Sequence, residues 1–309
     1  MTPSLLCLLD QEDSASLPWA LPALKALSQR WQLQVLCPPE QAGFLDALPW
    51  LTTPVLSAAS PWHWPALLAT LRRQHYQQLW DLSPGPLPPW RQLLPMLLKA
   101  DHKLLLADSS PFRGPSRLPW HAQHHLGERF SQALATQALS PDHHWLPTGT
   151  EQPLFAAIAE RPILAVNLLD DDGLVFMPLA ERFREVLAGV AKVAVVLLHP
   201  KPRQLDDVQS PRLFAIDEDA PPLLAWQVLA RAQSLFGVDS AWVQRAAVLG
   251  TPQLALFPED QGYIERWHPN DFNAVIWRLA AGEGLPLKDL LAKLRKLQRT
   301  MAEPTLNLI

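Results

Sequence analysis

The chain has 309 residues, of which 48% are hydrophobic and 18% are charged. This length exceeds one ordinary hydrophobic core and suits two α/β domains, and the composition argues against intrinsic disorder. The formal net charge of -4 argues against a general nucleic-acid binder, because such proteins attract phosphate backbones with a basic surface.

The cysteines and the amino terminus bear on the cellular compartment. Cys7 and Cys37, the two cysteines of the chain, each lie in an apolar run that predicts a strand. We therefore expect buried, reduced thiols, with a disulfide as the alternative. Residues 1–13 lack the basic stretch of a signal peptide. No apolar run reaches the roughly 18 residues that span a bilayer, so the sequence predicts a cytoplasmic protein.

In the first half of the chain, strand patterns alternate with helix patterns. Predicted strands cover residues 5–9, 33–37, 54–56, 78–82 and 103–107. Predicted helices cover residues 18–30, 42–48, 64–74, 91–98 and 121–139. Strands that alternate with helices at this spacing predict a doubly wound parallel sheet.

A polar, proline-bearing stretch at residues 140–153 interrupts this alternation. It predicts the domain boundary, so we expect an N-terminal domain over residues 1–148 and a C-terminal domain over residues 149–309. Beyond it, strands are predicted at residues 163–169, 193–198, 212–216, 235–238 and 254–257. Helices are predicted at residues 180–187, 222–232, 271–280 and 287–301, with a further helix between the last two strands.

Residues 234–257, SLFGVDSAWVQRAAVLGTPQLALF, form the most informative βαβ unit. Asp239 and Ser240 lie where the first strand gives way to the helix, and either side chain can cap the amides of the first helical turn. Gly250 and Pro252 end that helix. At the carboxyl ends of parallel strands, free helix amides and the helix dipole favour an anionic ligand. The unit therefore predicts either a ligand-binding edge or a plain helix cap.

Two groups of potential metal ligands have simpler interpretations. The acidic turn at residues 170–173, DDDG, lacks the spacing of a calcium loop, which favours a solvated turn over a metal site. His121, His124 and His125 have no cysteine nearby and no HExxH pattern, which favours a polar helix face over a zinc site. We therefore expect no metal.

The last predicted helix, residues 287–301, is amphipathic. Its apolar stripe consists of Leu287, Leu290, Leu291, Leu294, Leu297 and Met301. Its other faces carry Lys288, Lys293, Arg295, Lys296 and Arg299. This pattern favours a helix packed on the C-terminal domain with a solvated basic face, and a surface for an anionic membrane is the alternative.

The segment GVDSAWVQRAAVLGTPQLALFPED, residues 237–260, is similar to the donor-site segment of glycosyltransferase family 9, the bacterial ADP-heptose:lipopolysaccharide heptosyltransferases. That family has the pattern GVDTGxxHxAAALGxPxxxLFGPTDP. Four further segments resemble the family in the same order, namely ALPALKALSQRW, YQQLWDLSPG, HHLGERFSQAL and MPLAERFREVL, at residues 20–31, 76–85, 124–134 and 177–187. The resemblance implies an α/β protein of the GT-B type, with two Rossmann-like domains whose parallel sheets face a cleft.

The resemblance also implies where the chemistry lies. The catalytic base of the family is an Asp in the first loop, and the matching positions here are Ala15 and Ser16, so Asp13 becomes the candidate base with Ser16 beside it. The family's donor-loop Lys has no counterpart in the DDDG turn. Gln244 replaces the family's His. The implied donor-binding residues are Asp239, Ser240, Ala241, Gln244 and Asp260.

The activity implied by the resemblance is an inverting, metal-independent sugar transfer without a cofactor. Its donor would be ADP-heptose or a related nucleotide sugar. The acceptor, a lipopolysaccharide core or another glycan, would be held by loops around Arg72, Arg73, Asp81 and Trp90. Such an enzyme would be cytoplasmic, with peripheral contact to the inner membrane. The departures from the family motifs favour a second hypothesis, a GT-B scaffold without catalysis that binds a glycan or a protein.

Overall fold

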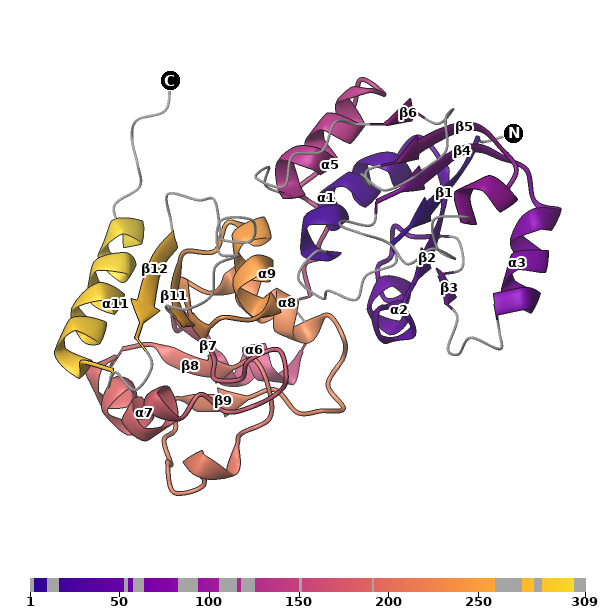
Figure 1. Cartoon of the computed structure of the whole chain (residues 1–309). Helices are drawn as coiled ribbons and strands as arrows, with labels where there is room; N and C mark the ends of the chain where they lie inside the picture. The colour runs from indigo at the N-terminus through magenta and orange to yellow at the C-terminus, as the bar shows by residue number, and fades with distance from the viewer. Residues whose placement is uncertain are drawn as a thin grey trace. The chain divides into compact units, whose positions relative to one another are not determined.

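The computed structural model describes residues 3–9, 17–52, 55–57, 64–82, 94–105, 116–117, 126–149, 152–190, 192–258, 274–280 and 285–302. The chain divides into two compact units (Figure 1). The N-terminal unit ends at Pro147, and the C-terminal unit begins at Thr148. The predicted boundary between residues 148 and 149 lies beside this position.

A six-stranded parallel sheet forms the centre of the N-terminal unit. Its strands are β1 (Ser4–Leu8), β2 (Gln32–Cys37), β3 (Val55–Ser57), β4 (Tyr76–Asp81), β5 (Ala100–Leu105) and β6 (Ser116–Arg117). Their order across the sheet is β3-β2-β1-β4-β5-β6. This is the doubly wound order in which the chain reverses its progression between β1 and β4, so the predicted sheet is confirmed.

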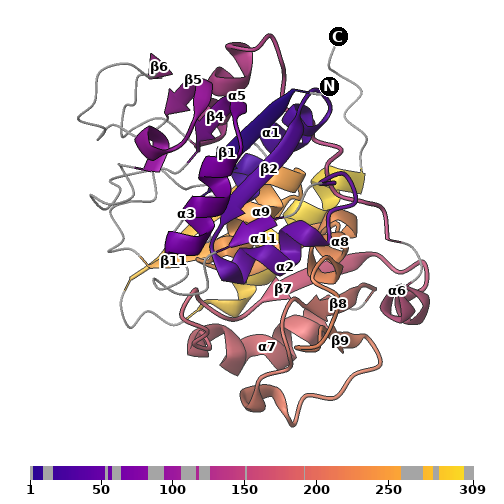
Figure 2. The ribbon, with the colours of Figure 1, turned by 90° about the vertical axis from the view of Figure 1, so that its right-hand side faces the viewer.

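The helices of this unit include α1 (Leu17–Ser28), α2 (Pro39–Asp46), α3 (Trp64–Arg73) and α5 (Leu126–Ala135). α3 covers one face of the sheet (Figure 2). On this face, Leu71 of α3 packs with Leu6 and Leu8 of β1. Successive residues of a strand point to opposite faces, so Cys7 faces the other side. Cys7 and Cys37 are both free and buried, as predicted, and burial raises the pKa of Cys37 to about 12.

The C-terminal unit contains a second six-stranded parallel sheet. Its strands are β7 (Ile163–Asn167), β8 (Ala194–Leu197), β9 (Leu213–Ala215), β10 (Ser234–Val238), β11 (Gln253–Pro258) and β12 (Ala274–Leu279). Their order is β12-β11-β10-β7-β8-β9. From its other edge, this sheet repeats the order of the first one, with β7 and β10 in the places of β1 and β4. The chain therefore reverses its progression between β7 and β10.

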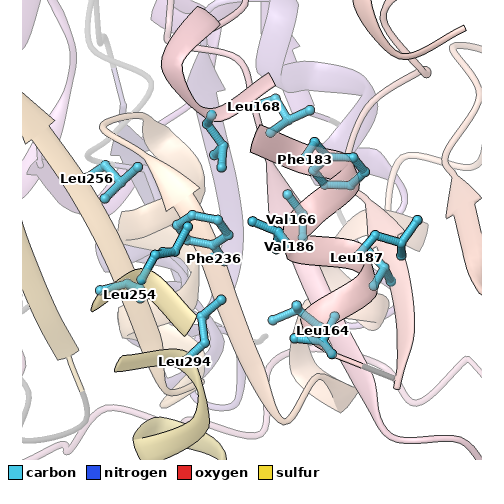
Figure 3. Packing of buried hydrophobic residues seen from close by; sticks show 14 of the residues in the cluster. Leu164, Val166, Leu168, Phe183, Val186, Leu187, Phe236, Leu254, Leu256 and Leu294 are labelled. Carbon is cyan, nitrogen blue, oxygen red and sulfur yellow. The ribbon is translucent and has the colours of Figure 1, made fainter. Parts of the chain in front are cut away.

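Helices cover both faces of the second sheet. They are α6 (Pro153–Ile158), α7 (Met177–Gly189), α8 (Leu224–Arg231), α9 (Ala241–Leu249) and α11 (Leu287–Ala302), with a 3-10 turn η2 (Arg203–Leu205). On one face, Phe183 and Val186 of α7 and Leu294 of α11 pack with Val166 and Phe236 of the sheet (Figure 3). On the other face lie α6, α8 and α9. Burial on both faces explains why these strands read as continuous apolar runs.

β12 corrects a prediction from sequence. A helix is predicted over residues 271–280, but Ala274–Leu279 form an edge strand that pairs in parallel with β11. Val275, Ile276 and Trp277 are β-branched or aromatic and suit a strand. The free edge of β11 also gives this segment backbone partners. Pairing with the sheet therefore outweighs helical periodicity.

The terminal helix α11 packs on the C-terminal unit as its apolar stripe predicts. Leu290, Leu294 and Leu297 are buried in the core beside α7, whereas Lys288 is exposed. The predicted packing of this helix on the C-terminal unit is therefore confirmed. Within the described ranges, no helix combines the length and the apolarity needed to cross a membrane.

Candidate functional site

Polar residues gather at the carboxyl edge of the C-terminal sheet. Asn167 ends β7, His199 follows β8, and Asp239 and Ser240 follow β10. Asn167 pairs with Gly237 in the register of β7 and β10, so the ends of these strands lie where the strand order reverses. Ligands of doubly wound sheets bind at this position.

Asn167 and Ser240 hold the two strand ends together. The Asn167 amide donates hydrogen bonds to the Ser240 hydroxyl at 2.8 Å and to the Leu169 carbonyl at 2.7 Å. The Ser240 hydroxyl donates in turn to the Val238 carbonyl at 3.0 Å. Asn167 and Ser240 are 0% and 4% exposed. The network fixes the turn after β10 against the loop after β7. Because the Ser240 hydroxyl donates its proton to the Val238 carbonyl, that proton is not available to a ligand.

His199 anchors the same loop from β8. The Leu168 N–H donates to Nε2 of His199 at 3.1 Å, so Nδ1 carries the ring proton and donates it to the Pro200 carbonyl at 2.7 Å. Burial lowers the pKa of His199, and the Pro200 carbonyl partly opposes this shift. The imidazole is therefore neutral at neutral pH. It accepts the Leu168 hydrogen bond and so holds the backbone of the loop after β7 in place.

The first amide of α9 is bound by a carboxylate from a distant part of the chain. The Ala241 N–H donates to Oδ1 of Asp171 at 2.8 Å. Ser240 precedes the helix in an extended conformation and makes no side-chain cap hydrogen bond. The prediction that Asp239 or Ser240 caps α9 is therefore wrong. The Ser240 hydroxyl is committed to Val238, and the charge of Asp171 complements the helix dipole in its place.

The turn at residues 170–173 presents Asp171 to α9. Oδ1 of Asp170 accepts hydrogen bonds from the amides of Asp172 at 3.1 Å and Leu174 at 2.8 Å. Gly173 has a φ of 76°, a left-handed conformation that glycine adopts without strain. The predicted acidic turn is present, but its middle carboxylate binds a helix amide. No group of three or more potential metal ligands occurs among the residues that the structure describes.

Asp239 is a partly exposed carboxylate at this edge. Its N–H donates to the Leu256 carbonyl at 2.8 Å, which ties the turn to β11. Desolvation, with a smaller contribution from the negative charge of Asp171, raises the pKa of Asp239 to about 6. The two carboxylates lie close enough to repel each other, and the charge of the site changes just below neutral pH.

Arg245 brings a cation to the same region. Its guanidinium lies 4.0 Å from the centroid of the Trp242 ring and 5.1 Å from that of Trp226. Its Nε is buried and has no hydrogen-bond partner in the described part of the chain. Burial lowers the pKa of Arg245 to about 10, and the charge of Asp171 opposes this shift. The guanidinium is therefore charged at neutral pH and attracted to Asp171.

The predicted donor-binding residues differ in how far their side chains can reach a ligand. Ser240, Ala241 and Gln244 are buried, at 4%, 6% and 2% exposure, whereas Asp239 is partly exposed. Of these four, Asp239 therefore has the most accessible side chain. The remaining predicted site residues, Asp13, Ser16 and Asp260, lie outside the described residues.

The residues predicted to hold the acceptor do not all lie together. Arg72 and Arg73 end α3, which leads into the amino end of β4, whereas Asp81 is the last residue of that strand. In a parallel sheet these positions belong to opposite edges. The prediction that the arginines and Asp81 surround one acceptor is therefore wrong. Trp90, the fourth member of that group, lies outside the described residues.

The sequence interpretation missed Asn167, His199 and the contact of Asp171. Asn167 and His199 each come directly after a buried apolar run, and this position signals the carboxyl end of a strand. A search for polar residues at strand ends would have found them. The bond from Ala241 to Asp171 joins residues 70 positions apart, so no local pattern indicates it.

Several solved structures share the fold of this chain. The ADP-heptose lipopolysaccharide heptosyltransferase II of Escherichia coli aligns with 97% of this chain and 100% of its own, with a TM-score of 0.72 and 15% identity. A glycosyl transferase family 9 protein from Veillonella parvula aligns over 97% and 99%, with a TM-score of 0.71 and 13% identity. A UDP-GlcNAc 2-epimerase from Neisseria meningitidis aligns over 97% and 94%, with a TM-score of 0.55 and 11% identity. The chain has the GT-B fold.

The GT-B fold confirms the predicted α/β class with two Rossmann-like units. The resemblance to glycosyltransferase family 9 is matched by structural likeness over nearly the whole chain. At identities this low the likeness shows the fold alone, and an epimerase shares it, so activity must be argued from the site. No protein-family model matches the chain, and no curated protein matches it.

Proposed function

We propose that the chain is a heptosyltransferase-like glycosyltransferase, which moves a sugar from a nucleotide-diphosphate donor to a glycan. The observation that carries the proposal is the Ala241 amide at the start of α9, which binds an anionic oxygen where the strand order reverses. Phosphate is the ligand for which such a helix start is best suited. The E. coli neighbour is an ADP-heptose heptosyltransferase by name, which supports ADP-heptose or a related nucleotide sugar as the donor.

The donor would bind along the turn that leads into α9. The amides of Ser240 and Ala241 would contact the diphosphate, and the Asp239 carboxylate would accept a hydrogen bond from a sugar hydroxyl. Gln244 and Asp260 complete the proposed donor set. Gln244 would act by supporting the helix start from within, because its side chain is buried.

Transfer with inversion needs a base for the acceptor and stabilisation of the leaving group. We assign the base to Asp13, and Ser16, three residues later in the sequence, would donate a hydrogen bond to it. The carboxylate takes the proton of the acceptor hydroxyl, whose oxygen bonds to the anomeric carbon while the bond from that carbon to the donor phosphate breaks. The leaving diphosphate keeps the electron pair, and the amides and dipole of α9 stabilise its charge without a metal ion.

The proposed acceptor is a lipopolysaccharide core or another glycan, and the proposed place is the cytoplasm beside the inner membrane. The exposed basic side chains of α11, which include Lys288 and Arg295, support peripheral contact, because anionic lipids attract basic surfaces.

A GT-B scaffold that binds without catalysis is the second candidate. The burial of Ser240 and Gln244 favours it, as does the Asp171 carboxylate on the Ala241 amide. The acidic turn at residues 170–173 also repels a diphosphate. Such a scaffold would bind a neutral glycan or another protein.

Nucleotide binding separates the two candidates. Thermal shift and calorimetry with ADP, UDP, GDP and their sugars should show stabilisation by one diphosphate, because a ligand that binds only the folded chain raises its melting temperature. ADP should stabilise more than AMP, since the β-phosphate would reach α9. If none of the nucleotides stabilises the protein, the second candidate, a binding scaffold without catalysis, is supported instead.

Asp13→Asn tests the base. The turnover number of sugar transfer should fall by about 10²–10⁴-fold, while the dissociation constant of the donor stays unchanged. Asp10→Asn, three residues earlier in the sequence, is the matched control and should leave turnover within about twofold of the unmodified protein. Equal losses in both variants would contradict the assignment.

A further inference from the structure

The amide that the proposed function offers to a phosphate is bound by the protein's own carboxylate. Oδ1 of Asp171 lies 2.8 Å from the Ala241 nitrogen. Carboxylates and phosphates are both anionic acceptors that helix starts favour. A phosphate can accept the Ala241 hydrogen bond only if Asp171 gives it up.

The charges nearby show what an incoming anion meets. Desolvation raises the pKa of Asp239, and the negative charge of Asp171 adds to this shift, so the two carboxylates repel each other. Arg245 is attracted to Asp171, and its buried Nε lacks a hydrogen-bond partner in the described ranges. A phosphate that replaces Asp171 keeps the attraction to Arg245. A phosphate that arrives while Asp171 stays adds a further repulsion.

The turn that carries Asp171 is exposed and can release its contact at low cost. Residues 170–173 are exposed, and Leu174 is 64% exposed. The hydrogen bonds that shape the turn lie within it, from Asp172 and Leu174 to Asp170. Displacement of Asp171 therefore leaves the turn itself intact, and segments with few buried contacts open most readily.

We propose that Asp171 is an intramolecular competitor of the donor diphosphate, which holds the start of α9 when no donor is bound and is displaced by the donor. The inference rests on the proposed function for the identity of that donor. It gives the turn at residues 170–173 a role in selectivity, because only a ligand with enough phosphate charge displaces the carboxylate.

A plain helix cap is the alternative role of Asp171, and one substitution distinguishes the two. Asp171→Asn keeps a side-chain oxygen that can accept the Ala241 hydrogen bond but removes the charge. A plain cap predicts unchanged affinity for anions. A competitor predicts tighter binding, because a neutral amide oxygen is the weaker acceptor and does not repel phosphate.

Asp172→Asn is the matched control. It removes the same charge from the next residue, which is exposed and whose side chain makes no hydrogen bond to α9 among the described contacts. Titration calorimetry of the full chain and both variants should use pyrophosphate and ADP as separate probes. We expect Asp171→Asn to bind both about tenfold more tightly, and Asp172→Asn to differ from the unmodified chain by less than about twofold.

The two probes keep the inference separate from the proposed function. If Asp171→Asn binds pyrophosphate more tightly but no form of the chain binds ADP, the role of Asp171 as a competitor is supported and the proposed nucleotide-sugar function is contradicted. Unchanged or weaker binding of ADP in Asp171→Asn would overturn the competitor and leave the function in place. Equal gains in both variants would show a general effect of net charge and would also overturn it. Thermal melts should confirm that both variants stay folded.

Discussion

The two sheets share a strand order but differ at their carboxyl edges. In the N-terminal sheet, the order reverses between β1 and β4, where Leu8 pairs with Asp81 and both are buried. In the C-terminal sheet it reverses between β7 and β10, where Asn167 and Ser240 hydrogen-bond to each other and Asp239 stays partly exposed. Topology thus supplies two equivalent positions. The residues at and after the strand ends decide what each position can bind.

The largest effect should come from the cores of the two corresponding strands. Trp80 of β4 and Phe236 of β10 are 1% and 0% exposed. Trp80→Ala and Phe236→Ala should each lower the free energy of unfolding by about 3–5 kcal/mol, because each leaves a cavity. Hydrogen exchange should show the loss of protection in the unit that carries the substitution. Loss in both units from either change would mean that the sheets do not unfold separately.

The next effect tests the polar edge itself. Asn167→Ala removes a buried donor from Ser240 and Leu169 and should lower the free energy of unfolding by about 2 kcal/mol. It should also weaken ADP binding, since the turn before α9 loses its anchor. Gln78→Ala, in the N-terminal sheet, removes a buried amide that bonds to Trp80 and Gln137 and serves as the control. Denaturant unfolding measures the free energy of unfolding, and calorimetry measures ADP affinity. Equal losses of ADP affinity in the two variants would contradict the assignment of ADP binding to the C-terminal edge.

The charge of Asp239 should make the C-terminal edge sensitive to pH. The folded protein holds the Asp239 proton up to a pKa of about 6, above the ordinary value of 3.8. The free energy of unfolding therefore falls as pH rises from about 4 to about 6 and stays lower above that window. Asp239→Asn removes this loss. The difference in free energy of unfolding between the variant and the unmodified protein should therefore be about 1 to 2 kcal/mol more favourable to the variant at pH 7.5 than at pH 4.5, after allowance for partial exposure.

Urea unfolding at the two pH values measures this gain. Asp217→Asn, at an exposed position of the same unit, controls for the loss of one negative charge. A gain for Asp239→Asn that is the same at both pH values would contradict the assignment of the raised pKa.

The smallest effect compares two glycines, one in each unit. Gly250 ends α9 in a left-handed conformation, with a φ of 70°, whereas Gly43 lies within α2. A Cβ at either position would meet nothing within 4 Å, so only backbone conformation differs. Gly250→Ala should destabilise by about 1 kcal/mol, and Gly43→Ala should stabilise by about 0.5 kcal/mol. Thermal unfolding measures both, and a stabilising Gly250→Ala would contradict the left-handed cap.

Local patterns predicted much of this fold. The apolar runs of β7, β8 and β10 are short, continuous and followed by polar or turn residues, so their identity as buried strands could be predicted without coordinates. Gly250 and Pro252 marked the end of α9 for the same reason. The segment that became β12 could not be assigned in this way, because its partner strand β11 decides its conformation and periodicity alone does not.

The candidate site could be located but not assembled from sequence. The motif around Asp239 indicated the correct strand end. The partner of the α9 amide could not be predicted, because Asp171 reaches it only after β7 and β10 pair. The sequence predicts that the Ser240 side chain caps the helix amides. In the structure, the Ser240 hydroxyl instead bonds to the Asn167 side chain and to the Val238 carbonyl.

The buried thiols have a practical consequence. Cys7 and Cys37 are the only cysteines in the sequence, and both belong to the N-terminal unit. Burial raises the pKa of both thiols, so alkylating reagents should modify them only when β1 and β2 open. The rate of alkylation therefore reports the opening of the N-terminal unit alone, because the C-terminal unit contains no cysteine, and no engineered label is needed.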